Sequence, residues 1–350
     1  KRQVRGFAPA AVRWSDLGTL PRYLDAVADA GPLAAGPVRI TPVTGHGSDR
    51  RFWRLDAPGW SAVAMRSTPD DAEFAPGLAI ARFLAAEGLG APAVLAVHER
   101  ERTVLMEDVG TESLADHADR PECGTVYGRV IDHLLRLQEA TGRARAACPA
   151  AVARTLDRSQ LAWETDYFCE RFLAGHLRIG AEQLARLADE LAALNATVAA
   201  QPLVLMHRDF QSRNILLQKD RVRLVDVQGM RLGPLGYDAA SLLWDPYVDL
   251  PAALRQELTT RFCRGAASAR GLPETAVAGC VLAAGLQRLM QALGAFGYLG
   301  HVKGKTAFLA HIPRGLAHLR ELLDRAGAAG GPRLPRLAAL LEGRPGADGS

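Results

Sequence analysis

A polar loop within residues 204–227 constrains this chain more than any other feature of its sequence. It interrupts a long stretch with helical periodicity, and two short apolar segments, 215–217 and 222–225, follow it as predicted strands. The loop itself reads HRDFQSRN from His207 to Asn214, and the second strand runs into an aspartate. The complete pattern is therefore His-x-Asp-x-x-x-x-Asn, followed by a strand that ends in Asp.

This spacing suits phosphoryl transfer. The reaction needs a carboxylate that orients an attacking hydroxyl, and oxygen ligands for a Mg²⁺ ion that bridges the nucleotide phosphates. Asp209 fits the first role, and Asn214 and Asp226 fit the second. His207 is expected to brace the loop through hydrogen bonds rather than act as a base. A lone His-x-Asp pair also occurs in purely structural loops, but the agreement of loop, Asn, strand and terminal Asp favours kinase-type catalysis.

The two parts of the chain on either side of residue 108 differ in their predicted secondary structure. Short strands dominate the first part, and Leu- and Ala-rich helices dominate the second. The predicted early elements are strands 38–43, 51–55, 61–66, 94–98 and 103–107, a helix at 71–87, and leading helices within 9–30. The predicted later helices are 125–141, 159–173, 181–199, 252–267, 274–296 and 306–326, with a short one at 335–341. The fold class is therefore α+β, with a small β-rich lobe joined at 107–111 to a larger helical lobe.

The loop resembles the catalytic loop of the aminoglycoside phosphotransferase-like branch of the protein-kinase-like fold. Gln211 stands where protein kinases usually carry a lysine, which points to the small-molecule kinases. The stretch DVQGMRLGPLGYDAASLL, from Asp226 to Leu243, is similar to bacterial cell-wall sugar kinases that phosphorylate the anomeric hydroxyl of N-acetylmuramate and N-acetylglucosamine. The likeness covers most of residues 40–250.

The resemblance implies a two-lobed protein-kinase-like fold. It places a nucleotide-binding lobe at 1–108, a catalytic and acceptor-binding lobe at 109–330, and a tail at 331–350. It also implies an ATP-dependent sugar kinase that uses Mg²⁺ and takes an amino sugar from cell-wall recycling as its small-molecule substrate. The residues by themselves indicate only a hydroxyl acceptor.

A glycine-containing turn, GHGSDR at 45–50, lies between the first two predicted strands. Glycines allow the backbone to approach phosphates, whose oxygens the backbone N–H groups bind. Because the turn stands ahead of a strand pair, as in kinases, we expect it to contact nucleotide phosphates, although the motif alone is equally typical of a tight hairpin. The candidate residues are Gly45, Gly47, Ser48 and Arg50.

The third predicted strand departs from the kinase pattern. Kinase-like folds usually carry a lysine there, in V-A-x-K, and pair it with a glutamate on a helix. This chain reads VAMR from Val63 to Arg66, so an arginine replaces the lysine. An arginine keeps the positive charge and offers a bidentate fork to phosphate. Arg66 is expected either to contact the nucleotide or to be a solvated strand end, and Glu73 is its suggested partner.

The junction between the two lobes resembles the kinase hinge, which binds the adenine edge through backbone hydrogen bonds. Here it reads Met106-Glu107-Asp108. The side chains of Glu107 and Asp108 are candidates for contact with the ribose, and exposure to water is the alternative that we favour. Both residues count as candidate cofactor-binding positions.

For the acceptor, the resemblance places a helix with polar residues beside the catalytic loop. The segment 163–172 is the candidate, because Trp163, Tyr167 and Glu170 fall on one helical face and offer a sugar a ring and an acceptor oxygen. A core-facing aromatic stripe with solvated acids is the alternative. The candidate substrate residues are Trp163, Asp166, Tyr167, Glu170 and Arg231, and Trp244, Asp245 and Tyr247 form a second group.

Two residues after the catalytic loop have more than one interpretation. Arg231 is a candidate for contact with substrate or phosphate, and equally for a structural ion pair. Asp238 precedes an apolar helix and is expected to cap that helix and to brace the catalytic core.

Charge and cysteine content argue against several classes of protein. Of 350 residues, 42 are basic and 38 acidic, so the net charge is +4, and the arginines are scattered rather than clustered as nucleic-acid binding requires. The five cysteines include no C-x-x-C pair, which argues against a disulfide framework or a zinc site. The longest apolar run, 276–286, is shorter than the roughly 18–20 residues that cross a bilayer, and no secretory signal follows the basic start. We expect a cytoplasmic monomer with neither a nucleic-acid nor a membrane partner.

Two other functions stay open. An aminoglycoside kinase would bind a polycation and would need an acidic acceptor cleft, for which this chain offers few acids. A nucleotide-binding pseudokinase is suggested by the arginine at position 66, but the intact Asp209, Asn214 and Asp226 argue against it.

Overall fold

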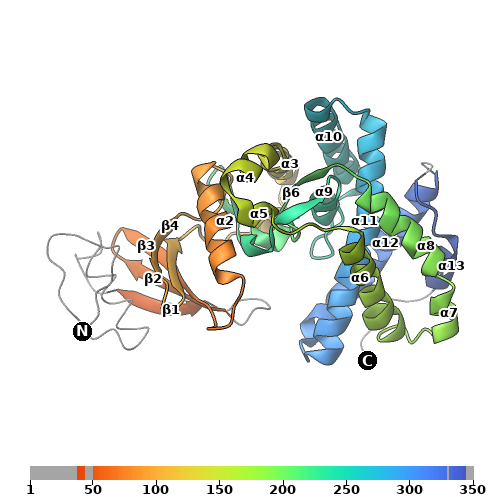
Figure 1. Ribbon diagram of the computed structural model, residues 1–350, viewed down its shortest axis with the longest axis horizontal. Coiled ribbons are helices and arrows are strands. Elements are labelled where there is room, and N and C mark those ends of the chain that lie inside the picture. Colours follow the sequence, from red (N-terminus) through yellow and green to blue (C-terminus); the bar gives the residue numbers. More distant parts are fainter. Residues whose placement is uncertain (1–37, 44–49, 329–330, 344–350) are drawn as a thin grey trace. The chain divides into compact units, whose positions relative to one another are not determined.

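The computed structural model describes residues 38–43, 50–328 and 331–343 (Figure 1). Contacts divide the chain into two compact units, unit 1 at Lys1–Gly110 and unit 2 at Thr111–Ser350. The leading helices expected within 9–30 lie outside the described residues.

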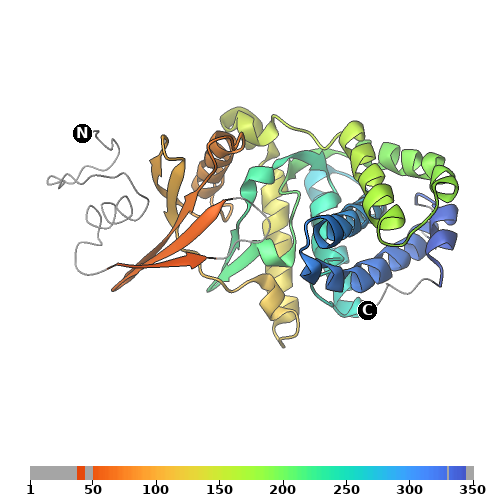
Figure 2. The same ribbon diagram turned by 90° about the horizontal axis from the view of Figure 1, so that it is seen from below.

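Unit 1 is built on a five-stranded antiparallel sheet with the order β1-β2-β3-β5-β4 (Figure 2). The strands are β1 (Arg39–Val43), β2 (Arg51–Ala57), β3 (Trp60–Arg66), β4 (Val94–His98) and β5 (Thr103–Glu107). The buried side chains between them are small or branched: Leu55, Ala62, Ala64, Ala96 and Leu105. Along β3 they alternate with more exposed residues, the period-two pattern of a strand with one buried face. All five strands were predicted, and β4 and β5 span the predicted residues.

Helix α2 (Phe74–Ala86) follows β3 in the chain and contacts β4. It begins three residues after the predicted start, because the Asp71 carboxylate accepts a hydrogen bond from Glu73 N (2.9 Å) and closes a local turn instead. Beyond the helix, Gly88 adopts a left-handed conformation with φ +65°, which ends the segment as the sequence predicted.

Unit 2 consists mainly of helices. They are α3 (Cys123–Glu139), α4 (Thr141–Ala147), α5 (Pro149–Val152), α6 (Arg158–Phe168), α7 (Ala181–Ala185), α8 (Ala188–Ala199), α9 (Tyr237–Leu243), α10 (Ala252–Arg270), α11 (Glu274–Gly297), α12 (Ile312–Ala328) and α13 (Pro335–Leu341). Helix α11 is central, because it contacts α6, α8, α9, α10 and α12. It approaches α6 closely: a Cβ at Gly294 would lie 3.2 Å from the Phe168 Cα. A larger side chain at position 294 would push the two helices apart.

Helix α11 and the π-helical turn that continues it are long and apolar enough to cross a membrane by length and composition. The segment Glu274–Val302 has a mean hydropathy of 1.4, and it is the one such helix in the described part of the chain. Most of its apolar window, 67%, is buried inside the protein. Packing against the surrounding helices therefore accounts for its composition. The helix predicted at 274–296 is confirmed to within one residue. Its apolar window extends beyond the unbroken apolar run at 276–286.

Three helices predicted as continuous are divided. The segment 159–173 changes from α6 into a π-helical turn at Cys169–Ala174. The segment 181–199 splits into α7 and α8 around Leu187, which is buried in the turn. The segment 306–326 begins as a 3-10 helix before α12. Periodicity predicts the buried face of a segment, but not the point at which its axis bends to follow the core.

Two small sheets hold the ends of the predicted catalytic loop. Strand β6 (Leu203–Met206) pairs with β9 (Arg231–Pro234), and β7 (Ile215–Gln218) pairs with β8 (Arg221–Leu224), all antiparallel. The β7–β8 hairpin was predicted. Strand β9 was not, because its glycine and proline are typical of a turn. The loop leaves β6 and enters β7, so both of its ends are fixed by strand pairing.

Helix α13 lies in the predicted tail at 331–350 and spans the residues predicted for it. Its Leu337 and Leu341 side chains are fully buried. Arg320 of α12 donates a hydrogen bond to the Leu341 carbonyl (2.6 Å). This part of the tail is therefore packed onto unit 2.

Candidate active site

The loop from His207 to Asn214 carries the predicted catalytic aspartate between β6 and β7. Phe210 is fully buried and anchors the middle of the loop. The His207 ring bonds to the Val225 carbonyl at the end of β8 (Nε2 to O, 2.9 Å) and lies edge-on to the Phe210 ring. The histidine therefore connects the loop to the β7–β8 hairpin.

Asp238 is buried and holds the start of the same loop. Its carboxylate accepts hydrogen bonds from the backbone N–H groups of His207 (2.6 Å) and Arg208 (3.0 Å). Arg208 has φ +80°, a backbone conformation that residues other than glycine rarely adopt, and these two bonds stabilise it. The expectation that Asp238 caps its own helix was wrong: Gly236 is the N-cap of α9, and the Asp238 carboxylate bonds to the loop instead. Burial raises the pKa of Asp238 to about 6.

A second buried carboxylate, Asp245, holds the middle of the loop. It accepts hydrogen bonds from the Ser212 N–H (2.7 Å) and hydroxyl (2.6 Å), and from Tyr247 N (2.9 Å). Asp245 and Trp244 are each 1% exposed. The second predicted acceptor group is therefore wrong for these two residues, whose side chains are enclosed in the core.

Asp209 has one carboxylate oxygen in an ion pair and the other open. Nη2 of Arg288, on α11, lies 3.1 Å from Oδ1 and 3.2 Å from the Gln211 side-chain oxygen. Oδ2 has no hydrogen-bond partner among the described residues, and the side chain is 35% exposed. Burial raises the pKa of Asp209, but the charges of Arg288 and Arg208 act against it and the net shift is downward. The carboxylate is therefore ionised at neutral pH, with an oxygen available to a hydroxyl.

Asn214 and Asp226 lie at the open end of the β7–β8 hairpin. The Asn214 carbonyl accepts a hydrogen bond from Val225 N (3.1 Å), which brings the two residues together. The Asn214 side-chain nitrogen donates to the Asp209 carbonyl (2.9 Å), so its side-chain oxygen is left for a ligand. Asp226 has φ +62°, and one of its oxygens contacts the Gln228 amide.

This pair of oxygen donors fits Mg²⁺. The ion prefers oxygen ligands and is usually held by one or two carboxylates together with substrate phosphates, rather than by a cage of protein side chains. Within the described residues, no three His, Cys, Asp or Glu side chains gather as a metal cluster. A site of one amide oxygen and one carboxylate therefore suits an ion that arrives with a nucleotide.

A comparison with protein-family models shows the family of this chain. Residues 39–272, more than half of the chain, match the model of the phosphotransferase enzyme family. The chain belongs to this family. The H-x-D-x-x-x-x-N loop and the Asp226 strand end both lie inside the matched region, so the chain is a phosphotransferase as its motifs predicted.

Two relatives of this phosphotransferase have the same name, N-acetylmuramate/N-acetylglucosamine kinase. The relative from Pseudomonas aeruginosa is 27% identical over 315 residues, which cover 88% of this chain and 89% of the relative. The relative from Neisseria meningitidis is 28% identical over 287 residues, which cover 79% and 83%. The family resemblance inferred from the motifs is therefore confirmed.

Solved structures show the same fold. A Plasmodium vivax ethanolamine kinase has a TM-score of 0.59 at 12% identity and covers 88% of this chain and 89% of its own. A Cryptosporidium parvum choline kinase has a TM-score of 0.58 at 14% identity, covering 87% and 93%. An ADP-bound aminoglycoside phosphotransferase has a TM-score of 0.55 at 12% identity, covering 85% and 97%. The phosphotransferase thus has the predicted protein-kinase-like α+β fold.

The glycine turn of unit 1 is described only at its end. Gly45, Gly47 and Ser48 lie outside the described residues. Arg50 lies inside them, and its Nε is 2.9 Å from Oδ2 of Asp71. The Arg50 side chain is 12% exposed, so this candidate for phosphate contact already has a carboxylate partner.

Arg66 also has a carboxylate partner within unit 1. Its Nη2 lies 2.8 Å from Oε2 of Glu101, in the turn between β4 and β5. The sequence had suggested Glu73, but β3 pairs with β5, so that the end of β3 meets the turn that precedes β5. Both side chains are about two fifths exposed.

The expectation that Glu107 and Asp108 face water was wrong for Asp108, and Glu107 is partly buried. Asp108 accepts hydrogen bonds from Nη2 of Arg54 (3.0 Å) and from Gly110 N (3.0 Å). It also forms an ion pair with Nε of Arg54 (2.9 Å), and its side chain is 9% exposed. Glu107 accepts a hydrogen bond from Ala93 N (3.1 Å). Both carboxylates hold the end of β5 to the rest of unit 1.

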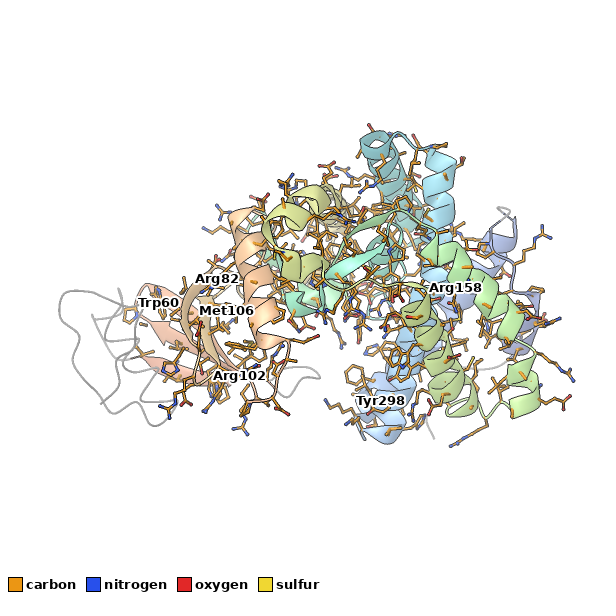
Figure 3. The ribbon with its side chains drawn as sticks, in the orientation of Figure 1. Trp60, Arg82, Arg102, Met106, Arg158 and Tyr298 are labelled. Carbon is orange, nitrogen blue, oxygen red and sulfur yellow. The ribbon has the colours of Figure 1, made fainter. Side chains whose placement is uncertain are left out.

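The predicted acceptor helix presents an aromatic pair to solvent. The Trp163 and Tyr167 rings stack at 5.0 Å, and the Tyr298 ring, labelled in Figure 3, lies 6.1 Å from Tyr167. Trp163 is 52% exposed, so the alternative of a core-facing stripe is wrong at this residue. Asp166 and Glu170 are exposed on the same helix and its π-helical extension.

Glu164 lies on the buried face of α6 and was not among the predicted site residues. Glu164 is 1% exposed, and the Tyr237 hydroxyl donates to its two oxygens (both 3.1 Å). Gln287 on α11 donates to Oε2 (3.3 Å), and Nη2 of Arg208 lies 3.8 Å from Oε1. Burial raises the pKa of Glu164. A polar network therefore connects α6, α9 and α11 to the predicted catalytic loop.

The sequence contained a signal for this network. Glu164 lies between Leu161 and Phe168 on the buried face of α6, where a carboxyl group requires a partner. Gln287 and Arg288 interrupt the long apolar helix α11 in the same way. A search for polar residues at positions predicted to be buried would have identified Glu164, Gln287 and Arg288.

Proposed function

We propose that this phosphotransferase moves the γ-phosphoryl group of ATP to the anomeric hydroxyl of an amino sugar, N-acetylmuramate or N-acetylglucosamine. The observation that carries the proposal is the open Oδ2 of Asp209, on a carboxylate that Arg288 holds near Asn214 and Asp226. The choice of sugar follows the names of the two bacterial relatives, which align with more than three quarters of the chain.

In this mechanism the acceptor hydroxyl donates a hydrogen bond to Oδ2 of Asp209. The ionised carboxylate orients the hydroxyl oxygen toward the γ-phosphorus and takes up its proton as the new bond forms. Asn214 and Asp226 would hold Mg²⁺, which neutralises charge on the nucleotide phosphates when bound. Asp238 and His207 support the site by fixing the loop. The rate gain comes mainly from positioning and electrostatics.

We assign nucleotide binding to the lobe at 1–108, and catalysis and acceptor binding to the lobe at 109–330. The proposed nucleotide-binding residues are Gly45, Gly47, Ser48, Arg50, Arg66, Glu107 and Asp108. For Arg50 and Arg66, contact with phosphate would compete with the ion pairs to Asp71 and Glu101.

We assign acceptor recognition to the exposed face of α6 and to β9. The aromatic pair of Trp163 and Tyr167 supports this proposal, because a sugar ring can pack on an exposed aromatic face. The proposed acceptor residues are Trp163, Asp166, Tyr167, Glu170 and Arg231.

We further propose that the protein acts as a cytoplasmic monomer without a nucleic-acid or membrane partner. Support comes from the small net charge and from the burial of α11 inside unit 2. Gel filtration coupled to light scattering tests the monomer, and a mass of two chains or more contradicts it.

A coupled assay of ADP release tests the function. The panel contains N-acetylmuramate, N-acetylglucosamine and the aminoglycoside gentamicin, with Asp209→Ala as the inactive variant and Asp220→Ala, an exposed residue of the β7–β8 turn, as the matched control. Release with either sugar, lost only in Asp209→Ala, is expected. Release with gentamicin alone, or tight Mg-ATP binding without release for any acceptor, contradicts the proposal.

A further inference from the structure

Arg231 is a buried cation that forms no ion pair within the described residues. It lies on β9, is 7% exposed, and its Nε donates a hydrogen bond to the Gly229 carbonyl (2.9 Å). Within the described part of the chain, no carboxylate forms an ion pair with it. An uncompensated buried charge is costly. A ligand that supplies a negative charge would account for the burial of this arginine.

Two further arginines accompany Arg231. Because β9 pairs with β6, Arg231 stands opposite Met206, two residues before Arg208. The backbone of Arg154 bonds to the next residue of β9, and the Arg154 guanidinium donates to the Gln228 carbonyl (2.6 Å), one residue before the carbonyl that Arg231 uses. Burial, and then repulsion by Arg208 and Arg154, lowers the pKa of Arg231 to about 10.

Two carboxylates, Glu164 and Asp209, attract Arg231, but neither forms an ion pair with it, and each has a closer partner. Glu164 is 3.8 Å from Nη2 of Arg208, but its oxygens accept hydrogen bonds from Tyr237, and burial raises its pKa. Asp209 is paired with Arg288. The positive charge of Arg231 and Arg208 is therefore only partly offset beside the Asp209 carboxylate.

We propose that Arg231 and Arg208, together with Arg154, form an anion subsite that binds a negatively charged group of a reactant next to Asp209. The inference rests on the proposed function and refines its substrate. N-acetylmuramate carries a carboxylate and N-acetylglucosamine does not, so a carboxylate on this subsite selects the acidic sugar. The phosphoryl group in transfer is the other source of the same charge. A guanidinium fork suits either anion.

Steady-state kinetics of Arg231→Gln and Arg208→Gln distinguish the two sources. If the subsite binds the carboxylate of the sugar, kcat/KM for N-acetylmuramate falls about 10- to 100-fold, while the value for N-acetylglucosamine changes less than about threefold. If it binds the phosphoryl group, both values fall together. The subsite is overturned if neither variant lowers kcat/KM for either sugar.

Controls separate loss of the subsite from loss of the fold. Arg231→Lys keeps the charge and is expected to recover part of the lost activity. Arg261→Gln, which removes an exposed arginine that pairs with Asp132, is expected to match the wild type. If Arg231→Gln does not fold, as its melting curve would show, Arg208→Gln carries the test, because Arg208 is 26% exposed on its side chain.

A binding measurement makes the inference independent of turnover. Inorganic phosphate and D-lactate are titrated by isothermal calorimetry into the wild type and into Arg231→Gln. Binding of either anion to the wild type, weakened about tenfold or more in the variant, supports the subsite even if no sugar is phosphorylated. In that case the proposed function fails and the subsite stands. Equal affinities in the two proteins overturn the subsite.

Discussion

Nη2 of Arg288 lies 3.1 Å from Oδ1 of Asp209. The arginine comes from α11, 79 residues after the aspartate, and its side chain is 8% exposed. Gln211 stands where protein kinases usually have a lysine, and its side-chain oxygen accepts from the same arginine nitrogen (3.2 Å). The cation beside the Asp209 carboxylate is thus supplied by a helix distant in the sequence, not by the loop itself.

Removing this cation is expected to change the pH dependence of the reaction. The pKa of Asp209 is lowered in the folded protein, so the carboxylate stays ionised well into the acid range. In Arg288→Gln that pKa rises, and the acid limb of the kcat profile moves to higher pH. Arg288→Lys keeps the charge and most of the wild-type profile. An acid limb that does not move in Arg288→Gln contradicts this role.

Asp238 is expected to matter for the loop rather than for its own helix. Asp238→Ala leaves the buried N–H groups of His207 and Arg208 without an acceptor, at a cost of about 1–3 kcal/mol each. Asp238→Asn keeps one acceptor oxygen, so its loss of stability should be smaller. Urea unfolding measures both, with the exposed Asp220→Ala as control. Equal stability of Asp238→Ala and wild type would contradict the hydrogen bonds described.

Asp71 is expected to make unit 1 sensitive to acid. Burial raises the pKa of Asp71, but hydrogen bonds from Arg50, Ser67 and Glu73 together outweigh burial. The net effect lowers the pKa from 3.8 to about 2. A carboxylate with a lowered folded-state pKa stabilises the protein above pH 4, and this contribution is lost as the pH falls from about 4 toward 2. It amounts to about 2 kcal/mol.

Urea unfolding of the whole chain between pH 6 and pH 3 checks this contribution. Asp71→Asn should be less stable than the wild type at pH 6, and the difference should shrink by about 1 kcal/mol at pH 3. A constant difference across this range would show that the Asp71 carboxylate does not titrate as described.

Trp163 is expected to affect the acceptor without affecting stability. Its ring is 52% exposed and stacks on Tyr167, so Trp163→Ala should cost about 0.5 kcal/mol or less. If the ring packs against the sugar, the KM for the sugar should rise about tenfold, and Trp163→Phe should retain most of the affinity. Steady-state kinetics at saturating ATP measure this. An unchanged KM in Trp163→Ala would remove the aromatic pair from the acceptor site.

The parts of the fold that depend on local pattern were predictable from the sequence. Strands β4 and β5 follow from short apolar segments separated by a charged turn, and their bounds match. The Asp209 loop and the β7–β8 hairpin follow from the spacing of a few polar residues. In each case the information lies within about twenty consecutive residues.

The partners of the polar residues were not predictable in the same way. Arg288 meets Asp209, and Asp238 meets the backbone at His207, only because α9 and α11 pack beside the Asp209 loop. Arg66 meets Glu101 because β3 pairs with β5. A charged residue on a strand end or in a helix can reach several others, and tertiary packing selects among them.

The product of the reaction tests the assignment of Asp209 and of its acceptor most directly. Phosphorus NMR can follow Mg-ATP and N-acetylmuramate with the wild type, Asp209→Ala and Asp220→Ala. We predict a new phosphate-ester signal coupled to the anomeric proton of the sugar with the wild type and Asp220→Ala, and its absence with Asp209→Ala, which should still bind Mg-ATP. A signal of the same intensity with Asp209→Ala, or only inorganic phosphate with the wild type, would contradict it.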